Sequence, residues 1–115
     1  MTLEHKVIAP DIQLLELDGR LVLGRESQRL EWQVEELVKS QQTKVILNMA
    51  LVPYVDSAGL GVLIGCNSKI KNAGGEMRIA AAEPRVLNLV KLAFLDTVLT
   101  FDATVADASK ALGAD

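Results

Sequence analysis

The apolar residues of this chain fall into two kinds of run, which predict strands and helices in alternation. Short continuous apolar runs bounded by turn-forming residues are typical of buried strands, and apolar residues spaced three and four apart are typical of helices. We expect strands at residues 4–9, 12–17, 44–49, 77–81 and 98–101. We expect helices at residues 26–40 and 57–73, a third from Glu83-Pro84 onward and a fourth capped near Thr104.

This order, β-β-α-β-α-β-α-β-α, predicts an α/β fold. Alternating strands and helices favour a mainly parallel sheet with right-handed crossovers, and the first two strands, separated only by Pro10-Asp11, add an antiparallel pair. We therefore expect a mixed sheet of 4–5 strands with about four helices packed against it. A single domain is expected over residues 1–115, with its core in about residues 12–112. Trp32 lies off the apolar stripe of the first helix, and we expect a neighbouring loop to cover it partly.

Composition and charge argue against several classes of function. Half of the 115 residues are apolar, which is enough for a hydrophobic core without disulfides or metals. The net charge is only -3 and the basic residues are scattered, so we expect no nucleic-acid partner. No apolar run approaches the roughly 20 residues of a membrane span, and residues 1–6 do not resemble the start of a signal peptide. Cys66 is the single cysteine, which agrees with a reducing cytoplasm.

The most informative stretch is Val55-Asp56-Ser57-Ala58-Gly59-Leu60-Gly61, which joins an expected strand to an expected helix. Open α/β sheets commonly present their sites at such a junction. The Ser57 hydroxyl is flanked by small residues and lies near the unpaired N–H groups of the helix start, which accommodate a phosphate. A phosphate on Ser57 would add about -1.5 to -2 charges beside Asp56 and would change what this surface binds. The alternative, from position alone, is that Asp56 or Ser57 only caps the helix.

Other chemistries lack the residues that they need. Gly59 and Gly61 resemble the start of a dinucleotide fingerprint, but Ile64 stands where the third glycine is required. A catalytic serine needs a base, and His5, the only histidine, lies in the amino-terminal segment. His5 and Cys66 together offer no metal-ligand spacing. We therefore expect no cofactor, no metal and no enzymatic activity, and we interpret the glycines as places of close packing or as room for a partner.

At these residues the sequence resembles the STAS domain family, and within it the bacterial anti-sigma factor antagonists. The resemblance extends over about residues 12–112. The matching segments are Leu17-Asp18-Gly19-Arg20-Leu21, Val45-Ile46-Leu47-Asn48-Met49, the stretch around Ser57, Gly74-Gly75-Glu76-Met77-Arg78-Ile79, and residues 86–95. The Asp56-Ser57-Ala58-Gly59-Leu60 element, followed at this distance by the Gly74-Gly75 turn, is fairly specific for the family.

The resemblance implies a regulator that changes partners when it is phosphorylated. In the family, an anti-sigma factor with a serine-kinase fold uses ATP and magnesium to phosphorylate the serine that aligns with Ser57, and a PP2C-type phosphatase reverses the reaction. The unphosphorylated antagonist sequesters the anti-sigma factor and so frees a sigma factor for transcription. On this basis the protein is a cytoplasmic kinase substrate. A weak homodimer is a further candidate for its state of association, which the sequence leaves open. The implied contact surface comprises Asp56, Ser57, Ala58, Gly59 and Leu60, with Tyr54, Gly24 and Arg25 beside them.

Two further alternatives remain open. Some STAS domains are constitutive scaffolds of signalling assemblies or small subunits of lipid transporters, and in such a protein Ser57 would only cap its helix. A small enzyme or ligand carrier is suggested solely by the glycines and the position of the stretch at the edge of the sheet. Family members often carry aspartate where this chain has Asn48 and Arg25, so this chain has fewer acidic groups at those positions.

Overall fold

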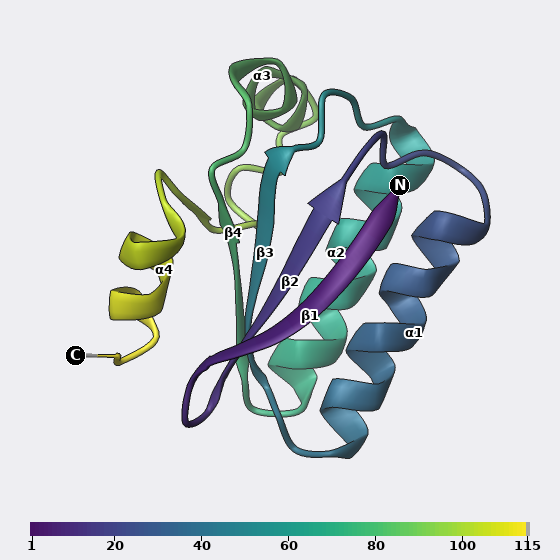
Figure 1. The fold of residues 1–115 in the computed structure, drawn as a ribbon. Helices are drawn as coiled ribbons and strands as arrows, with labels where there is room; N and C mark the ends of the chain where they lie inside the picture. The colour runs from purple at the N-terminus through teal and green to yellow at the C-terminus, as the bar shows by residue number, and fades with distance from the viewer. Residues whose placement is uncertain (115) are drawn as a thin grey trace.

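The computed structural model describes residues 1–114 and contains one five-stranded sheet and four helices in the expected order (Figure 1). The elements are β1 (Thr2–Ala9), β2 (Ile12–Asp18), α1 (Arg25–Lys39), β3 (Lys44–Leu51), α2 (Ser57–Asn72), β4 (Glu76–Ala80), α3 (Pro84–Leu92), β5 (Phe101–Asp102) and α4 (Val105–Ala111). The strands lie in the order β1-β2-β3-β4-β5, with β1 antiparallel to β2 and every other neighbouring pair parallel. The predicted mixed, mainly parallel α/β fold is therefore confirmed.

Both faces of the sheet carry a hydrophobic core. Figure 1 shows α1 and α2 on one face and α4 on the other. On the first face, Leu47 of β3 belongs to the same buried cluster as Leu30 of α1 and Leu63 of α2, and on the second face Ile46 packs with Ala108 of α4. The centre of β3, Val45-Ile46-Leu47, is fully buried and continuously apolar, as is typical of a strand that is covered on both faces. Within residues 1–114, no helix is long and apolar enough to cross a membrane.

Two expectations about individual segments are wrong. β5 comprises only Phe101–Asp102, and residues 98–100 do not continue it, because the N–H groups of Val98 and Leu99 both donate to the Leu95 carbonyl in a turn. Leu99 is buried in the core, so its apolar character serves packing and not a strand. Trp32 is 60% exposed and not covered by a loop, since it projects from the side of α1 opposite the buried stripe.

Close backbone contacts at both ends fix the position of α2. At its start, a Cβ on Gly59 would overlap the carbonyl oxygen of Leu21, so only glycine allows this approach. At its far end, Gly74 has a φ of +84°, a left-handed conformation that ends helices. A Cβ on Gly75 would overlap Thr43. These contacts place the first turn of α2 beside the carboxyl ends of β2 and β3.

Candidate functional site

The junction between β3 and α2 is held by backbone pairing with the segment that follows β2. The Leu21 N–H donates to the Tyr54 carbonyl at 3.0 Å, and the Asp56 N–H donates to the Leu21 carbonyl at 3.2 Å. Leu21 and Val55 form a short parallel bridge and both are buried. The chain therefore reaches Asp56 along a defined path, although Tyr54 and Asp56 lie outside the named strands.

Asp56 is the residue that caps α2. Its Oδ1 accepts a hydrogen bond from the Gly59 N–H at 2.7 Å, and its Oδ2 accepts one from the Leu23 N–H at 3.1 Å. These hydrogen bonds, the one from Gly59 first, lower the pKa of Asp56 below its ordinary value, so the carboxylate is ionised at neutral pH. Since Leu23 precedes α1, the same carboxylate joins the starts of α1 and α2. Of the two residues considered as the cap, Asp56 fills that role and Ser57 does not, because Asp56 accepts the N–H that a cap must satisfy.

Ser57 is the first residue of α2 and is exposed. No side-chain hydrogen bond of the Ser57 hydroxyl is found within residues 1–114, which leaves this group to solvent. The hydroxyl lies next in sequence to an ionised carboxylate and at the positive end of the α2 dipole. The Ser57 hydroxyl is therefore accessible to another protein, and among the described residues it makes no hydrogen bond that the fold requires.

A groove lies next to Ser57 between the starts of α1 and α2, and we call it the α1–α2 groove. It has a volume of about 280 Å³ and is lined by Leu23, Gly24, Ser27, Gln28, Glu31, Ala58, Gly61 and Val62. The structure thus brings together Gly24 and Ala58, two residues predicted for partner binding. Leu23, at 80% exposure, and Val62 were not singled out from the sequence, although an apolar loop residue next to Gly24 was a usable signal. Gly61 keeps the groove open, because nothing lies within 4 Å of the place where its Cβ would be.

Tyr54 borders a different groove, between the β3–α2 junction and α3. That groove also has a volume of about 280 Å³ and is lined by Tyr54, Val55, Arg85, Val86, Asn88, Leu89 and Leu92. The Tyr54 ring is 45% exposed, and the Arg20 guanidinium lies 5.9 Å from its centroid. Tyr54 and Gly24 therefore belong to two separate surfaces on either side of the junction.

The remaining predicted contact residues lie at different depths. Arg25 is exposed as the first residue of α1 and lines neither groove. Gly59 is buried against Leu21, and Leu60 is only 7% exposed in the core. Gly59 and Leu60 thus form the layer that supports Ser57 and Ala58, while Arg25 lies at the margin of the site.

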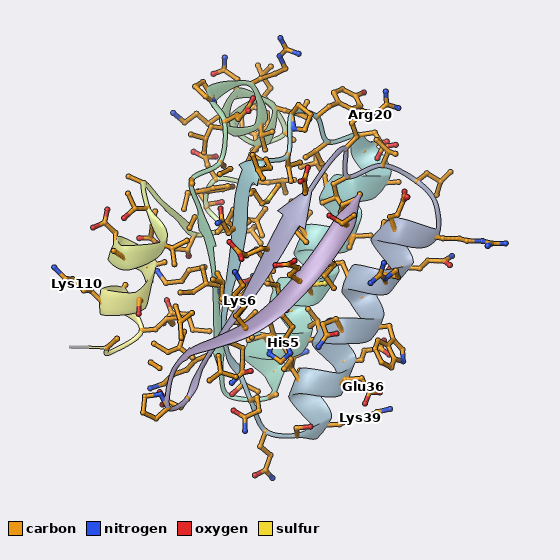
Figure 2. All side chains as sticks on the ribbon, viewed as in Figure 1. His5, Lys6, Arg20, Glu36, Lys39 and Lys110 are labelled. Atoms are coloured by element: carbon orange, nitrogen blue, oxygen red, sulfur yellow. The ribbon has the colours of Figure 1, made fainter. Side chains whose placement is uncertain are left out.

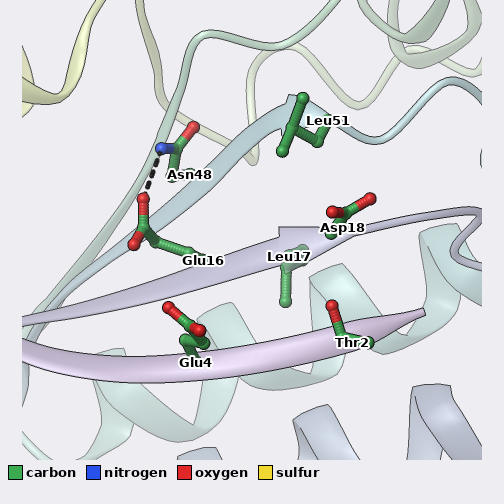
Figure 3. Close-up of a pocket in the computed structure, with 7 residues that line it drawn as sticks. All are labelled: Thr2, Glu4, Glu16, Leu17, Asp18, Asn48 and Leu51. Carbon is green, nitrogen blue, oxygen red and sulfur yellow. Dashed lines mark hydrogen bonds between the residues drawn. The ribbon is translucent and has the colours of Figure 1, made fainter.

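A third cavity lies on the face of the sheet that carries α4, away from α1 and α2 (Figure 3). It has a volume of about 180 Å³ and is lined by Thr2, Glu4, Glu16, Leu17, Asp18, Asn48 and Leu51. Asn48 Nδ2 donates to Glu16 at 3.2 Å, and the Ala50 N–H donates to Asn48 Oδ1 at 3.1 Å. Asn48 therefore belongs to this cavity and not to the grooves beside Ser57. In the part of the chain that the structure describes, no three acidic, histidine or cysteine side chains are arranged to hold a metal ion.

Comparison with known proteins finds a matching family and named relatives. The sequence profile of the STAS domain matches residues 5–108. The anti-sigma F factor antagonist of Paenibacillus polymyxa is 28% identical over 74 residues, which are 64% of this chain and 63% of that protein. The chain therefore aligns with less than two thirds of that relative's length.

Solved structures share the fold at lower identity. The anti-sigma factor antagonist SpoIIAA in its unphosphorylated form has a TM-score of 0.76 at 16% identity, over 98% of this chain and 100% of that one. The phosphorylated form of SpoIIAA, from Bacillus, has a TM-score of 0.75 at 15% identity, over 96% and 98%. A sulfate transporter family protein from Wolinella succinogenes has a TM-score of 0.78 at 18% identity, over 93% and 88%. At these identities the likeness establishes the fold alone.

Proposed function

The chain belongs to the STAS domain family, and we propose that it is an anti-sigma factor antagonist whose partner binding is switched by phosphorylation of Ser57. One observation carries the proposal: Asp56 caps α2 and leaves the Ser57 hydroxyl exposed at the start of the helix. The name of the Paenibacillus polymyxa relative supports the class of function. SpoIIAA, which has the same fold, is known in an unphosphorylated and a phosphorylated form, which supports the kind of switch.

The switch would act through charge on the surface and not through a change of fold. A phosphate on Ser57 adds roughly -1.5 to -2 charges next to the ionised Asp56. A partner that packs closely over Ser57 and the α1–α2 groove would have to remove water from that phosphate, which is costly without a paired cation. In the unbound protein, the amino end of α2 lowers the energy of the phosphate, so the modified protein remains folded.

The proposed contact surface has Ser57 and Ala58 at its centre. Gly24 extends it across the α1–α2 groove, Asp56 forms its edge, and Gly59 and Leu60 support it from below. Tyr54 and Arg25 flank the surface on different sides. The proposed partner is an anti-sigma factor with a serine-kinase fold, and a PP2C-type phosphatase restores the hydroxyl.

In this proposal the protein is a substrate and not a catalyst. The kinase supplies ATP, magnesium and the base, and this chain supplies the Ser57 Oγ. The oxygen attacks the γ-phosphorus of ATP, the bond to the ADP oxygen breaks, and the hydroxyl proton passes to the kinase base. The reaction would take place in the cytoplasm, where the sigma factor acts on transcription.

Binding of the cognate anti-sigma kinase by Ser57 variants tests the proposal. Incubation with the kinase, ATP and magnesium should add one phosphate, which peptide mapping should locate at Ser57 and which Ser57→Ala should abolish. Ser57→Asp should weaken binding roughly ten-fold or more, because it introduces a charge where the partner packs. Ser68, exposed on the same helix, provides the matched control, and Ser68→Asp should bind like the unmodified protein. A phosphate found elsewhere, or full-strength binding by Ser57→Asp, would overturn the switch.

A constitutive subunit of a transporter or signalling scaffold is the second candidate. The structural likeness to a sulfate transporter family protein favours it. Such a subunit should co-purify with a large complex from the native cell, and neither phosphatase treatment nor Ser57→Asp should release it. The same Ser57→Asp variant therefore separates the two candidates.

A further inference from the structure

β1 is an edge strand whose outer side is unpaired among the described residues. It comes first in the strand order and pairs only with β2. It is eight residues long, and its central side chains, Glu4 through Val7, are exposed. Edge strands of this length offer a row of backbone N–H and C=O groups to another strand unless proline, unmatched charges, a bulge or a covering segment prevents it. In β1 the bulge lies only at the far end, between Val7 and Ala9.

The side chains of β1 divide between the two faces of the sheet. Lys6 is paired with Leu14 and Glu4 with Glu16, so Glu4 and Lys6 lie on the face that carries α4. His5 is paired with Leu15, which lies in the core under α1 and α2, so His5 lies on the opposite face. Figure 2 shows His5 and Lys6 along β1, far from Lys110 on α4. The charged pair and the histidine therefore alternate along an open edge.

We propose that β1 pairs antiparallel with β1 of a second copy of this chain, about a two-fold axis at His5. In that register, Glu4 of each copy lies opposite Lys6 of the other, which gives two oppositely charged cross-strand pairs. On the other face, Val7 of each copy lies opposite Leu3 of the other. Such cross-strand pairs stabilise antiparallel sheets, and the same surface serves both subunits, as a two-fold interface requires.

The charges select this register over its neighbours. A shift of the axis to Glu4 places Glu4 opposite Glu4 of the second copy, and a shift to Lys6 places Lys6 opposite Lys6. Like charges directly opposite destabilise a strand pair. In the single chain the Lys6 ammonium leans toward β2, where it contacts Glu16 at 2.7 Å, and it lies 3.8 Å from Glu4. In the dimer it would also have to reach the second copy's Glu4 across the open edge.

The dimer would be weak, and it would present two Ser57 sites to partners. A single strand pair buries a small area, and the side chains on the edge are mostly polar. Because the two sheets run in opposite directions across the axis, the two Ser57 residues lie at opposite ends of the joined sheet, and each remains accessible. The inference does not depend on the function of Ser57, so it and the proposed function fail independently.

Cysteine crosslinking of the full chain tests the register. Directly opposite residues in an antiparallel pair have Cα atoms about 4.5–5.5 Å apart, which a disulfide can bridge, whereas diagonal neighbours at about 7–8 Å are too far apart. Burial raises the pKa of the Cys66 thiol to about 12, so the native cysteine does not compete. With oxidised glutathione, His5→Cys should crosslink to itself. Glu4→Cys and Lys6→Cys should each fail alone and should crosslink when mixed, with one variant isotopically labelled to identify the mixed dimer by mass.

Controls make each outcome decisive. Lys110→Cys, exposed on α4, measures crosslinking by random collision, and circular dichroism verifies that each variant is folded. In sedimentation experiments, Glu4→Lys should weaken the dimer several-fold, since it places two lysines opposite each other. Self-crosslinking of Lys6→Cys faster than His5→Cys would overturn the register. Crosslinking of His5→Cys no faster than that of Lys110→Cys would overturn the dimer itself.

Discussion

Gly59 lies directly against the carbonyl oxygen of Leu21, and a Cβ on residue 59 would overlap that oxygen. The same Cβ would lie 2.9 Å from Cγ1 of Val55. Two residues further along α2, Gly61 faces the open α1–α2 groove with nothing within 4 Å of its Cβ position. One glycine allows α2 to approach the sheet, and the other keeps the surface beside Ser57 hollow.

Alanine substitutions at these two glycines should change stability in opposite directions. Gly59→Ala should lower the free energy of unfolding by about 1–3 kcal/mol, because α2 must move away from Leu21. Gly61→Ala should raise it by roughly 0.5–1 kcal/mol, because alanine is the better helix former and meets no neighbour. Urea denaturation monitored by circular dichroism measures both. If both variants lost the same free energy of unfolding, Gly59 and Gly61 would not have the different packing roles assigned to them.

Filling the α1–α2 groove should affect binding and not folding. Gly61→Leu places a side chain in the groove next to Ala58, and we expect it to weaken binding of the anti-sigma partner several-fold while the melting temperature is kept. Gly65, one turn further along α2, also has nothing within 4 Å of its Cβ position but does not line the groove. Gly65→Leu is therefore the matched control and should bind normally in a titration calorimetry experiment. Equal binding by both variants would exclude the groove from the interface.

Removal of the Asp56 carboxylate should lower stability in a pH-dependent way. Its pKa is lower in the folded than in the unfolded protein, so its contribution is present above the unfolded value and is lost as the pH falls through the folded value. The melting temperature of Asp56→Ala should therefore lie below that of the wild type at neutral pH, and the gap should narrow below the ordinary carboxyl pKa of 3.8. Ser57→Ala should melt like the wild type, because Ser57 is not the cap. A larger loss from Ser57→Ala than from Asp56→Ala would reverse this assignment.

The position of the short strand β5 should depend on the bidentate ion pair between Arg78 of β4 and Asp102 of β5. Arg78 donates to Asp102 through Nε at 2.7 Å and through Nη2 at 3.1 Å, and both side chains are largely buried. Arg78→Lys keeps the charge but loses the bidentate hydrogen bonding, and it should lower the free energy of unfolding by about 1–2 kcal/mol. Hydrogen exchange should quicken in β5 and α4 first. The surface pair of Lys39 with Glu36 is the control, and Lys39→Ala should change stability by less than about 0.5 kcal/mol.

Aspartate at residue 48 should be unfavourable in this chain. Asn48 donates to Glu16, and a carboxylate in its place would face the Glu16 carboxylate without a proton between them. Asn48→Asp should therefore lower the melting temperature at neutral pH. Repulsion by Glu16 raises the pKa of the new carboxyl group in the folded state. The difference in melting temperature between Asn48→Asp and the wild type should therefore shrink as the pH falls through that raised pKa. A difference that is constant with pH would exclude charge repulsion as the cause.

The order and type of the elements could be predicted from the sequence, because they depend on local spacing. The apolar residues of α1 recur at helical intervals, and Gly74 supplies the helix stop where the spacing ends. The boundaries of short elements were harder to predict from the sequence. Leu99 is as apolar as a strand residue, but it is buried in a turn, and only its neighbours in space distinguish the two roles.

For the site, the sequence by itself predicted a location: a small, polar strand-to-helix junction carrying Asp56 and Ser57. Only the tertiary structure decided the division of roles between those two residues and the surface around them. Besides capping α2 through Gly59, the Asp56 carboxylate accepts the N–H of the distant Leu23 and so joins the starts of α1 and α2. Gly24 and Ala58 share a groove because α1 and α2 pack side by side, and Tyr54 faces another groove because α3 lies on the other side of the junction. Such relationships join residues that are far apart in the chain, and local sequence patterns do not encode them.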